Sequence, residues 1–189
     1  MTSISQSTVQ LKKVNDSVPD PKITVLMSVY NGSPYLNAAI SSILRQTLNQ
    51  FEFLIIDDAS TDGSRGQLKT WADRDERIRL IFHSKNRGLG YSLREGVREA
   101  KGNWIARMDD DDIALPDRLE RQISYLNEHP DVDILSGWAI DCDRDGNPLR
   151  LRQVPTSHEE IVRLIWTIPI VHPAVIFRRD AIIDAGSYS

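Results

Sequence analysis

ITVLMSVYNGSPYL, at residues 23–36, joins a short apolar run to a turn and to the start of an amphipathic segment. The run from Ile23 to Tyr30 predicts a buried strand, and Asn31-Gly32 ends it. We expect Ser33 to cap a helix that has Pro34 at its first position. Apolar residues then follow at helical spacing, namely Leu36, Ile40, Ile43 and Leu44.

The same alternation continues along the chain. Further strands are predicted at 51–56, 78–82 and 104–108, and helices at 67–74 and 89–100. Strands that alternate with helices indicate an α/β fold with a mostly parallel central sheet flanked by helices. In open sheets of this kind, ligands bind at the carboxyl ends of the strands.

The second half of the sequence is mixed in character. We expect a helix at 116–127, strands at 132–140 and 171–177, and a hairpin turn at Asp145-Gly146. Ser157 begins a capping-box pattern for a short helix. Residues 1–22 are rich in Ser, Thr, Gln and Pro, so we expect a disordered leader before one domain at 23–189.

Composition excludes several classes of protein. The 189 residues are 40% hydrophobic and 26% charged, which is typical of a globular chain. The net charge of −4 argues against a general nucleic-acid binder, and the single cysteine, Cys142, cannot form an internal disulfide. No apolar run of about 18 residues is present, so we expect no membrane span.

Three of the predicted strands end in polar residues: Tyr30-Asn31, Asp57-Asp58 and the run Asp109-Asp110-Asp111-Asp112. Four adjacent carboxylates repel one another unless solvent or a cation compensates their charge. A solvated acidic turn is the simpler interpretation. The run directly follows a buried strand, however, and oxygen ligands suit Mg²⁺ or Mn²⁺, so we favour a metal site.

The other polar positions each allow two interpretations. Asp57-Asp58 could cap a helix and face water, or could accept hydrogen bonds from a base or a ribose. Tyr30 could be the last core residue of its strand, or its ring could support a base. The turn Asn86-Arg87-Gly88 could be ordinary, or Arg87 could offset phosphate charge while Gly88 permits close backbone approach. His172 stays undecided.

Taken together, these segments resemble the family 2 glycosyltransferases, which have the GT-A nucleotide-diphospho-sugar transferase fold. The resemblance rests on five stretches in order: ITVLMSVYNGSPYL at 23–36, FEFLIIDDASTDGS at 51–64, NRGLGYSL at 86–93, GNWIARMDDDDIALPDRLERQ at 102–122 and HPAVIFRRDAIIDAGSYS at 172–189. It implies a nucleotide-binding half at about 23–112 and the start of an acceptor half at about 113–189.

The resemblance also implies roles for particular residues. Ser28 and Tyr30 would lie beside the nucleotide base, and Asp58 would hydrogen-bond it. Arg87 and Gly88 would lie near the nucleotide. Asp111 would be the principal ligand of Mn²⁺ or Mg²⁺, and Asp109 would reach the metal or the ribose. Asp110 replaces the small residue that is frequent in the family, which implies a more acidic site, and Arg94 stands where an asparagine is frequent.

The implied reaction transfers a sugar from a nucleotide-diphosphate sugar, with UDP as the expected nucleotide, to a saccharide or lipid-linked acceptor with inversion. A glutamate–aspartate pair usually supplies the base in this family, beyond a segment like Gly186-Ser187-Tyr188. Asp180 and Asp184 come too early, so we expect no catalytic base within the chain and an amino-terminal fragment of a larger enzyme. The resemblance further implies polysaccharide or glycoconjugate synthesis in the cytoplasm, which could take place at the inner face of the membrane.

Two other functions stay open. A sugar-phosphate nucleotidyltransferase of related fold normally has a glycine-rich basic loop after its first strand, whereas residues 30–34 offer one glycine and no cation. A sugar-nucleotide-binding module without turnover would share the same site residues. Sequence pattern does not fix the donor sugar, the acceptor or the oligomeric state.

Overall fold

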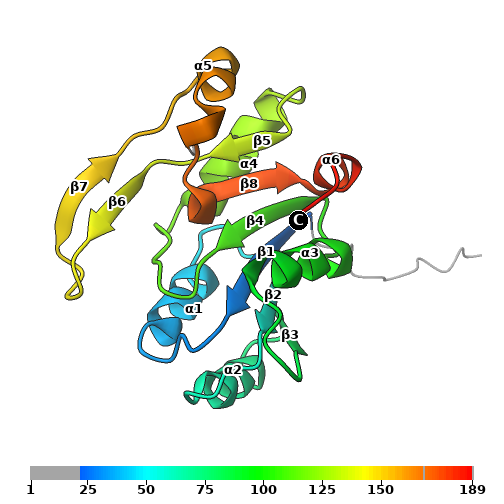
Figure 1. Ribbon diagram of the computed structural model, residues 1–189, viewed down its shortest axis with the longest axis vertical. Helices are drawn as coiled ribbons and strands as arrows, with labels where there is room; N and C mark the ends of the chain where they lie inside the picture. Colours follow the sequence, from blue (N-terminus) through cyan, green and yellow to red (C-terminus); the bar gives the residue numbers. More distant parts are fainter. Residues whose placement is uncertain (1–21, 168, 189) are drawn as a thin grey trace, which may run out of the picture.

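A six-stranded sheet forms the centre of the chain. The computed structural model describes residues 22–167 and 169–188. Four strands run parallel and adjacent: β3 (Ile78–Phe82), β2 (Glu52–Asp57), β1 (Ile23–Val29) and β4 (Trp104–Met108). Two antiparallel strands, β8 (Val175–Arg178) and β5 (Ile134–Ser136), extend the sheet beyond β4, giving the order β3-β2-β1-β4-β8-β5 (Figure 1). The predicted α/β fold with a mostly parallel sheet is confirmed.

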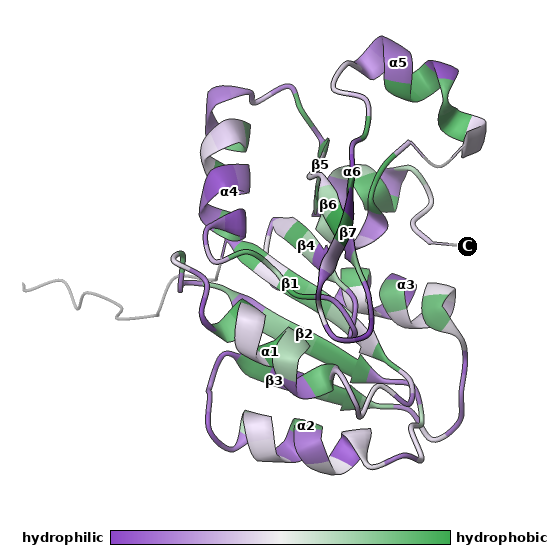
Figure 2. Cartoon of the chain, turned by 90° about the vertical axis from the view of Figure 1, so that its left-hand side faces the viewer, coloured by the Kyte–Doolittle hydropathy of each residue, from purple (hydrophilic) through white to green (hydrophobic). Residues whose placement is uncertain are grey.

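Helices cover both faces of this sheet. Apolar residues of α1 (Leu36–Leu44), α2 (Ser64–Ala72) and α4 (Arg118–Glu128) join Val25, Met27 and Val29 of β1 in one buried cluster. On the other face, α3 (Leu89–Glu99) packs against Leu26, and Ile182 of α6 (Arg179–Asp184) lies beside the same cluster. Side chains of a strand alternate between faces, and Figure 2 shows the apolar colouring concentrated on the central strands.

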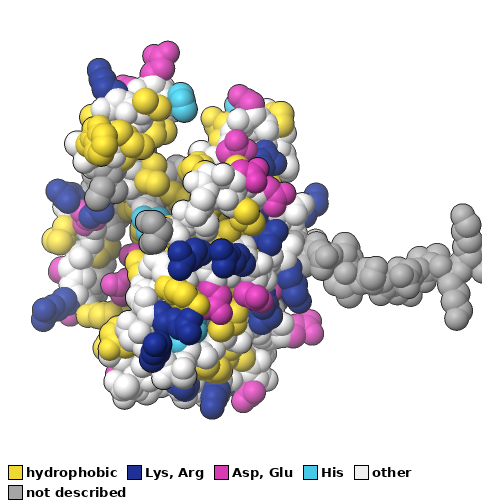
Figure 3. Space-filling model, turned by 45° about the vertical axis from the view of Figure 1, so that its right-hand side comes forward, with side chains coloured by type: hydrophobic (Ala, Val, Ile, Leu, Met, Phe, Trp, Pro, Cys, Tyr) yellow, Lys and Arg dark blue, Asp and Glu magenta, His cyan; other side chains and the backbone are white. Residues whose placement is uncertain are grey.

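A hairpin and a short helix project away from the sheet. The hairpin pairs β6 (Ala139–Cys142) with β7 (Pro148–Arg152), as the Asp145-Gly146 turn predicts. α5 (His158–Arg163) begins at Ser157, whose hydroxyl accepts the Glu160 N–H, and the 3₁₀ turn η1 (Ile165–Thr167) follows. Apolar side chains gather at this end of the molecule, among them the 94% exposed Trp166 (Figure 3).

Three local predictions are wrong. Ser33 does not cap α1: the helix starts at Leu36 after Tyr35, with no side-chain cap, and Ser33 Oγ instead accepts a hydrogen bond from Gln67 Nε2 at 2.8 Å. The strand predicted at 132–140 divides at Gly137-Trp138, because β5 pairs with β8 in the central sheet whereas β6 pairs with β7 in a separate hairpin.

The strand predicted at 171–177 begins only at Val175. Pro173 has no N–H for a sheet ladder, and residues His172–Ala174 form the 3₁₀ turn η2. The predicted leader at 1–22 lies outside the described residues, apart from Lys22. Within the described ranges, no helix has both the length and the apolar character that a membrane crossing requires.

Candidate functional site

The polar ends of β1, β2 and β4 meet at one edge of the sheet, because the three strands are parallel neighbours. Hydrogen bonds join the loops that follow β1 and β2: Asn31 N–H donates to Ser60 Oγ at 3.0 Å, and Thr61 N–H donates to Asn31 Oδ1 at 2.8 Å. Asn31 has a φ of 58°, a left-handed conformation that asparagine tolerates. The loops after β1 and β2 are therefore joined at the edge of the sheet where β4 also ends.

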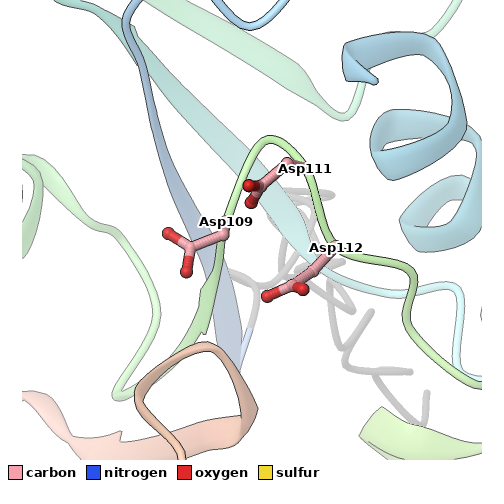
Figure 4. A group of neighbouring side chains, drawn as sticks. All are labelled: Asp109, Asp111 and Asp112. Atoms are coloured by element: carbon pink, nitrogen blue, oxygen red, sulfur yellow. The ribbon is translucent and has the colours of Figure 1, made fainter. Parts of the chain in front are cut away.

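Asp109, Asp111 and Asp112 form an acid cluster directly after β4. One carboxylate oxygen of each lies within 4.8 Å of one oxygen of each of the others (Figure 4). Asp111 is exposed, while Asp109 and Asp112 are half-buried. Burial raises the pKa of Asp112, and the charges of Asp109 and Asp111 raise it further. Three carboxylates at this spacing can share a hard cation with oxygen ligands.

Asp110 is turned away from the acid cluster. Its carboxylate lies so close to Gly32 that a methyl group at Gly32 would overlap it. Burial raises the pKa of Asp110 to about 6, with the Asp111 charge as the next cause. The fourth acid therefore packs against the turn after β1 and is not one of the three clustered acids.

Asp57 and Asp58 are both buried, and they do different things. Asp57 is fully buried and pairs with Arg65, whose Nη2 lies 2.6 Å from Asp57 Oδ2. Arg65 Nη2 also donates to His83 O at 2.8 Å, so the Asp57–Arg65 pair fixes α2 against the end of β3. Neither aspartate faces water, which excludes the simpler interpretation of this pair as a helix cap and a solvated acid.

Asp58 holds the turn that precedes α3. Its carboxylate accepts N–H bonds from Arg87 at 2.9 Å and from Gly88 at 2.7 Å. His83 Nδ1 lies 2.7 Å from the same carboxylate, and His83 Nε2 lies 2.7 Å from Glu95 Oε2 on α3. Gly88 has a φ of 86°, which favours glycine. The structure thus brings Asp58, Arg87 and Gly88 together at one turn.

The side chains of Ser28, Tyr30 and Arg87 lie at the rim of the site. Ser28 is half-buried, and Tyr30 is 53% exposed, so Tyr30 is not a core residue. The exposed Arg87 guanidinium lies 4.4 Å from the centre of the Tyr91 ring, and Arg94 lies 5.4 Å from the same centre. Arg94 therefore takes part in an aromatic stack beside the Arg87 turn.

Two arginines below the acid cluster, the buried Arg107 and the half-buried Arg118, were not predicted from the sequence as part of the site. Arg107 lies within β4 and forms an ion pair with Asp109. Arg118, at the start of α4, donates to Arg107 O at 2.8 Å and to Val175 O at 3.3 Å, and burial lowers its pKa to about 10. The signal for Arg107 was a charged residue inside the otherwise apolar strand WIARM.

His172 and Tyr188 form a further pair near this end of β4. His172 Nε2 lies 3.0 Å from Tyr188 Oη, and η2 contacts β4. Burial lowers the pKa of His172 and raises that of Tyr188 to about 12, while Arg107 and Asp109 also act on both groups. Both side chains are therefore neutral near pH 7.

The sequence profile of the family described as "Glycosyl transferase family 2" matches residues 24–186. The chain belongs to this family. It is 39% identical over 170 residues to the amylovoran biosynthesis glycosyltransferase AmsE of Erwinia amylovora, a match covering 87% of this chain and 63% of AmsE. It is 33% identical to the putative glycosyltransferase EpsE of Bacillus subtilis, over 85% of this chain and 58% of EpsE. The chain thus spans about three fifths of the length of these relatives.

Solved structures show the same fold. The mannosyltransferase PcManGT from Pyrobaculum calidifontis, in complex with GDP-Man and Mn²⁺, aligns with a TM-score of 0.68 at 19% identity, over 91% of this chain and 48% of PcManGT. S. aureus TarS 1-349, in complex with UDP-GlcNAc, aligns with a TM-score of 0.71 at 22% identity, over 88% of this chain and 48% of TarS. The GT-A fold expected from the resemblance is confirmed.

Proposed function

We propose that this chain carries the donor site of an inverting glycosyltransferase that uses a nucleotide-diphosphate sugar and a divalent cation in polysaccharide or glycoconjugate synthesis. The observation that carries the proposal is the acid cluster of Asp109, Asp111 and Asp112 at the carboxyl end of β4. It lies at the sheet edge where α/β folds bind ligands, beside the loops after β1 and β2. The names of AmsE and EpsE agree with this class of reaction.

The residues of the cluster fit a divalent cation by their chemistry, since all three offer carboxylate oxygens. We assign Asp111 as the principal ligand because it is the exposed member, with Asp109 and Asp112 beside it. A cation held there would neutralise charge on the leaving diphosphate. Asp109 would also be placed to reach the ribose.

We propose that the nucleotide lies along the rim formed by Ser28, Tyr30 and the Arg87-Gly88 turn. Tyr30 offers an exposed ring to a base, and the exposed Arg87 guanidinium offers a positive charge to phosphate. The Asp58 oxygens already accept the Arg87 and Gly88 N–H groups. We therefore propose that Asp58 contributes to base binding mainly by holding this turn in place. We expect UDP to be the nucleotide. GDP is the alternative to test beside it, because PcManGT was solved in complex with GDP-Man.

In the proposed step, the acceptor oxygen forms a bond to the anomeric carbon as the bond to the diphosphate oxygen breaks. The acceptor proton passes to a carboxylate base, and the nucleoside diphosphate leaves. Asp180 and Asp184 are poor candidates for that base: Arg178 pairs with Trp104 at the amino end of β4, so α6 starts at the opposite end from Asp109. We therefore place the base outside residues 22–188.

Calorimetry with UDP and GDP, with and without Mn²⁺, tests the proposal. We expect nucleotide binding that depends on Mn²⁺ and is lost in Asp111→Ala, and is kept in a matched control, Asp131→Ala, at an exposed acid outside the site. Equal binding by all three proteins would remove Asp111 from the metal role. Release of sugar from a nucleotide sugar would then separate a transferase from a binding module without turnover.

A further inference from the structure

Arg107 is a charged residue in the interior of the sheet. It is 2% exposed, and its neighbours in β4, Ala106 and Met108, belong to the apolar core. Arg107 is paired in register with Leu26 of β1, and with Ile105 it shares the α3 face of the sheet. Asp109 follows two residues later on the same face. The strand thus directs a buried guanidinium to the base of the acid cluster.

The guanidinium is only partly paired. One nitrogen, Nη2, forms the ion pair with Asp109 Oδ1. Nε and Nη1 are buried and have no hydrogen-bond partner among the residues that the structure describes. The charged groups close enough to interact with the Arg107 guanidinium are Asp109, Asp112 and Arg118. The nearby His172 and Tyr188 are neutral near pH 7. Arg107 therefore has a positive charge that is not cancelled by a dedicated partner outside the cluster.

A positive charge in this position opposes a cation at the cluster, and its ion pair occupies one oxygen of Asp109. Both effects weaken the binding of a bare divalent ion. A diphosphate brings further oxygens and negative charge, and Mg²⁺-type sites commonly combine one or two carboxylates with substrate phosphates. The ion would then be held firmly only together with the nucleotide.

We propose that Arg107 is a positioning residue that restrains Asp109 and lowers the affinity of the acid cluster for a free divalent cation. This inference rests on the proposed function, because it assumes a cation at Asp109, Asp111 and Asp112. If the inference holds, replacing Arg107 by a neutral residue raises the affinity of the acid cluster for a free divalent cation. If Arg107 serves only for packing, the same replacement lowers this affinity, because it loosens the cluster.

The test is a titration of the chain with Mn²⁺ alone, followed by the paramagnetic resonance signal of unbound Mn²⁺. We expect Arg107→Met to bind Mn²⁺ at least about fivefold more tightly than the wild type, because even in water two unit charges ~4 Å apart change an equilibrium by about that factor. Arg107→Lys keeps the charge and is expected to stay within about twofold of the wild type. Arg107→Gln is the second neutral variant if Arg107→Met does not fold.

Arg79→Met is the matched control. It removes the same charge from an arginine that pairs with the buried Glu52, which lies at the opposite end of the strands from the acid cluster. Its Mn²⁺ affinity is expected to equal that of the wild type. Unchanged or weaker affinity in the folded neutral variants, Arg107→Met and Arg107→Gln, overturns the inference, as does equal tightening in Arg107→Lys and Arg107→Met. Absence of Mn²⁺ binding by every protein, with or without UDP, overturns the proposed function as well.

Discussion

Asp58→Ala should destabilise the protein strongly even when no nucleotide is present. The substitution removes the acceptor for three internal donors: Arg87 N–H, Gly88 N–H and His83 Nδ1. Asp58 is 1% exposed, so water does not readily replace it. Each such bond contributes about 1 kcal/mol, more when a charged group takes part, and buried donors left unpaired add a penalty. We expect a loss of about 3–5 kcal/mol, a large part of the ~5–15 kcal/mol typical of a domain.

Urea unfolding followed by circular dichroism, without nucleotide or metal, measures this loss. Asp62→Ala is the control, because Asp62 also accepts three hydrogen bonds, from Ser33 N–H and from the Ser64 N–H and hydroxyl, but lies at the surface. Ser64 itself is buried, but water can enter the space of the exposed Asp62 carboxylate, so the control should lose less than Asp58→Ala. A loss below about 1 kcal/mol in Asp58→Ala, or equal losses in both variants, would refute the idea that Asp58 holds the turn.

Two further predictions concern packing and pH. Gly32→Ala should displace Asp110 and cost about 1–3 kcal/mol of unfolding free energy, with weaker Mn²⁺ binding. Gly66→Ala is the control, because an added methyl meets nothing there: Mn²⁺ binding should be unchanged, and stability should not fall, since alanine favours the helix α2. Equal behaviour of the two variants would contradict the close contact. Burial opposes ionisation of Glu52, but hydrogen bonds from Lys101, Thr24 and Arg79 outweigh it and hold its pKa below 4.5. The stabilisation from Glu52 is thus complete above about pH 4.5 and is lost as the pH falls through the lower, folded-state pKa. Glu52→Gln should lower stability at pH 7 and flatten this acid dependence in thermal unfolding; an unaltered pH profile would count against it.

The sequence was sufficient to predict the repeating part of the fold. Apolar runs at 23–30 and 51–56 predicted strands, because parallel strands that are covered on both faces consist almost entirely of apolar residues. The same pattern failed in the second half. Gly137 and Pro173 each interrupt an apolar run, and the outcome depended on where their backbone groups found partners, which periodicity does not encode.

The site was predictable in outline for a similar reason. Parallel neighbours place their carboxyl ends at one edge, so the gathering of Tyr30, Asp58 and the four aspartates followed from strand order. The direction of each side chain did not follow. Asp110 packs against Gly32, which is distant in sequence. Arg107 is buried below the cluster by other elements of the fold. Local sequence pattern encodes neither of these tertiary contacts.

The central claim is that Asp109, Asp111 and Asp112 hold a divalent cation together with a nucleoside diphosphate. The most direct measurement is anomalous diffraction at the manganese edge from crystals grown with Mn²⁺ and UDP. We expect one strong peak in contact with Asp111 and with the diphosphate oxygens, and no such peak in Asp111→Ala crystals. A bound nucleotide with no manganese at the acid cluster, or a peak that persists in the variant, would contradict it.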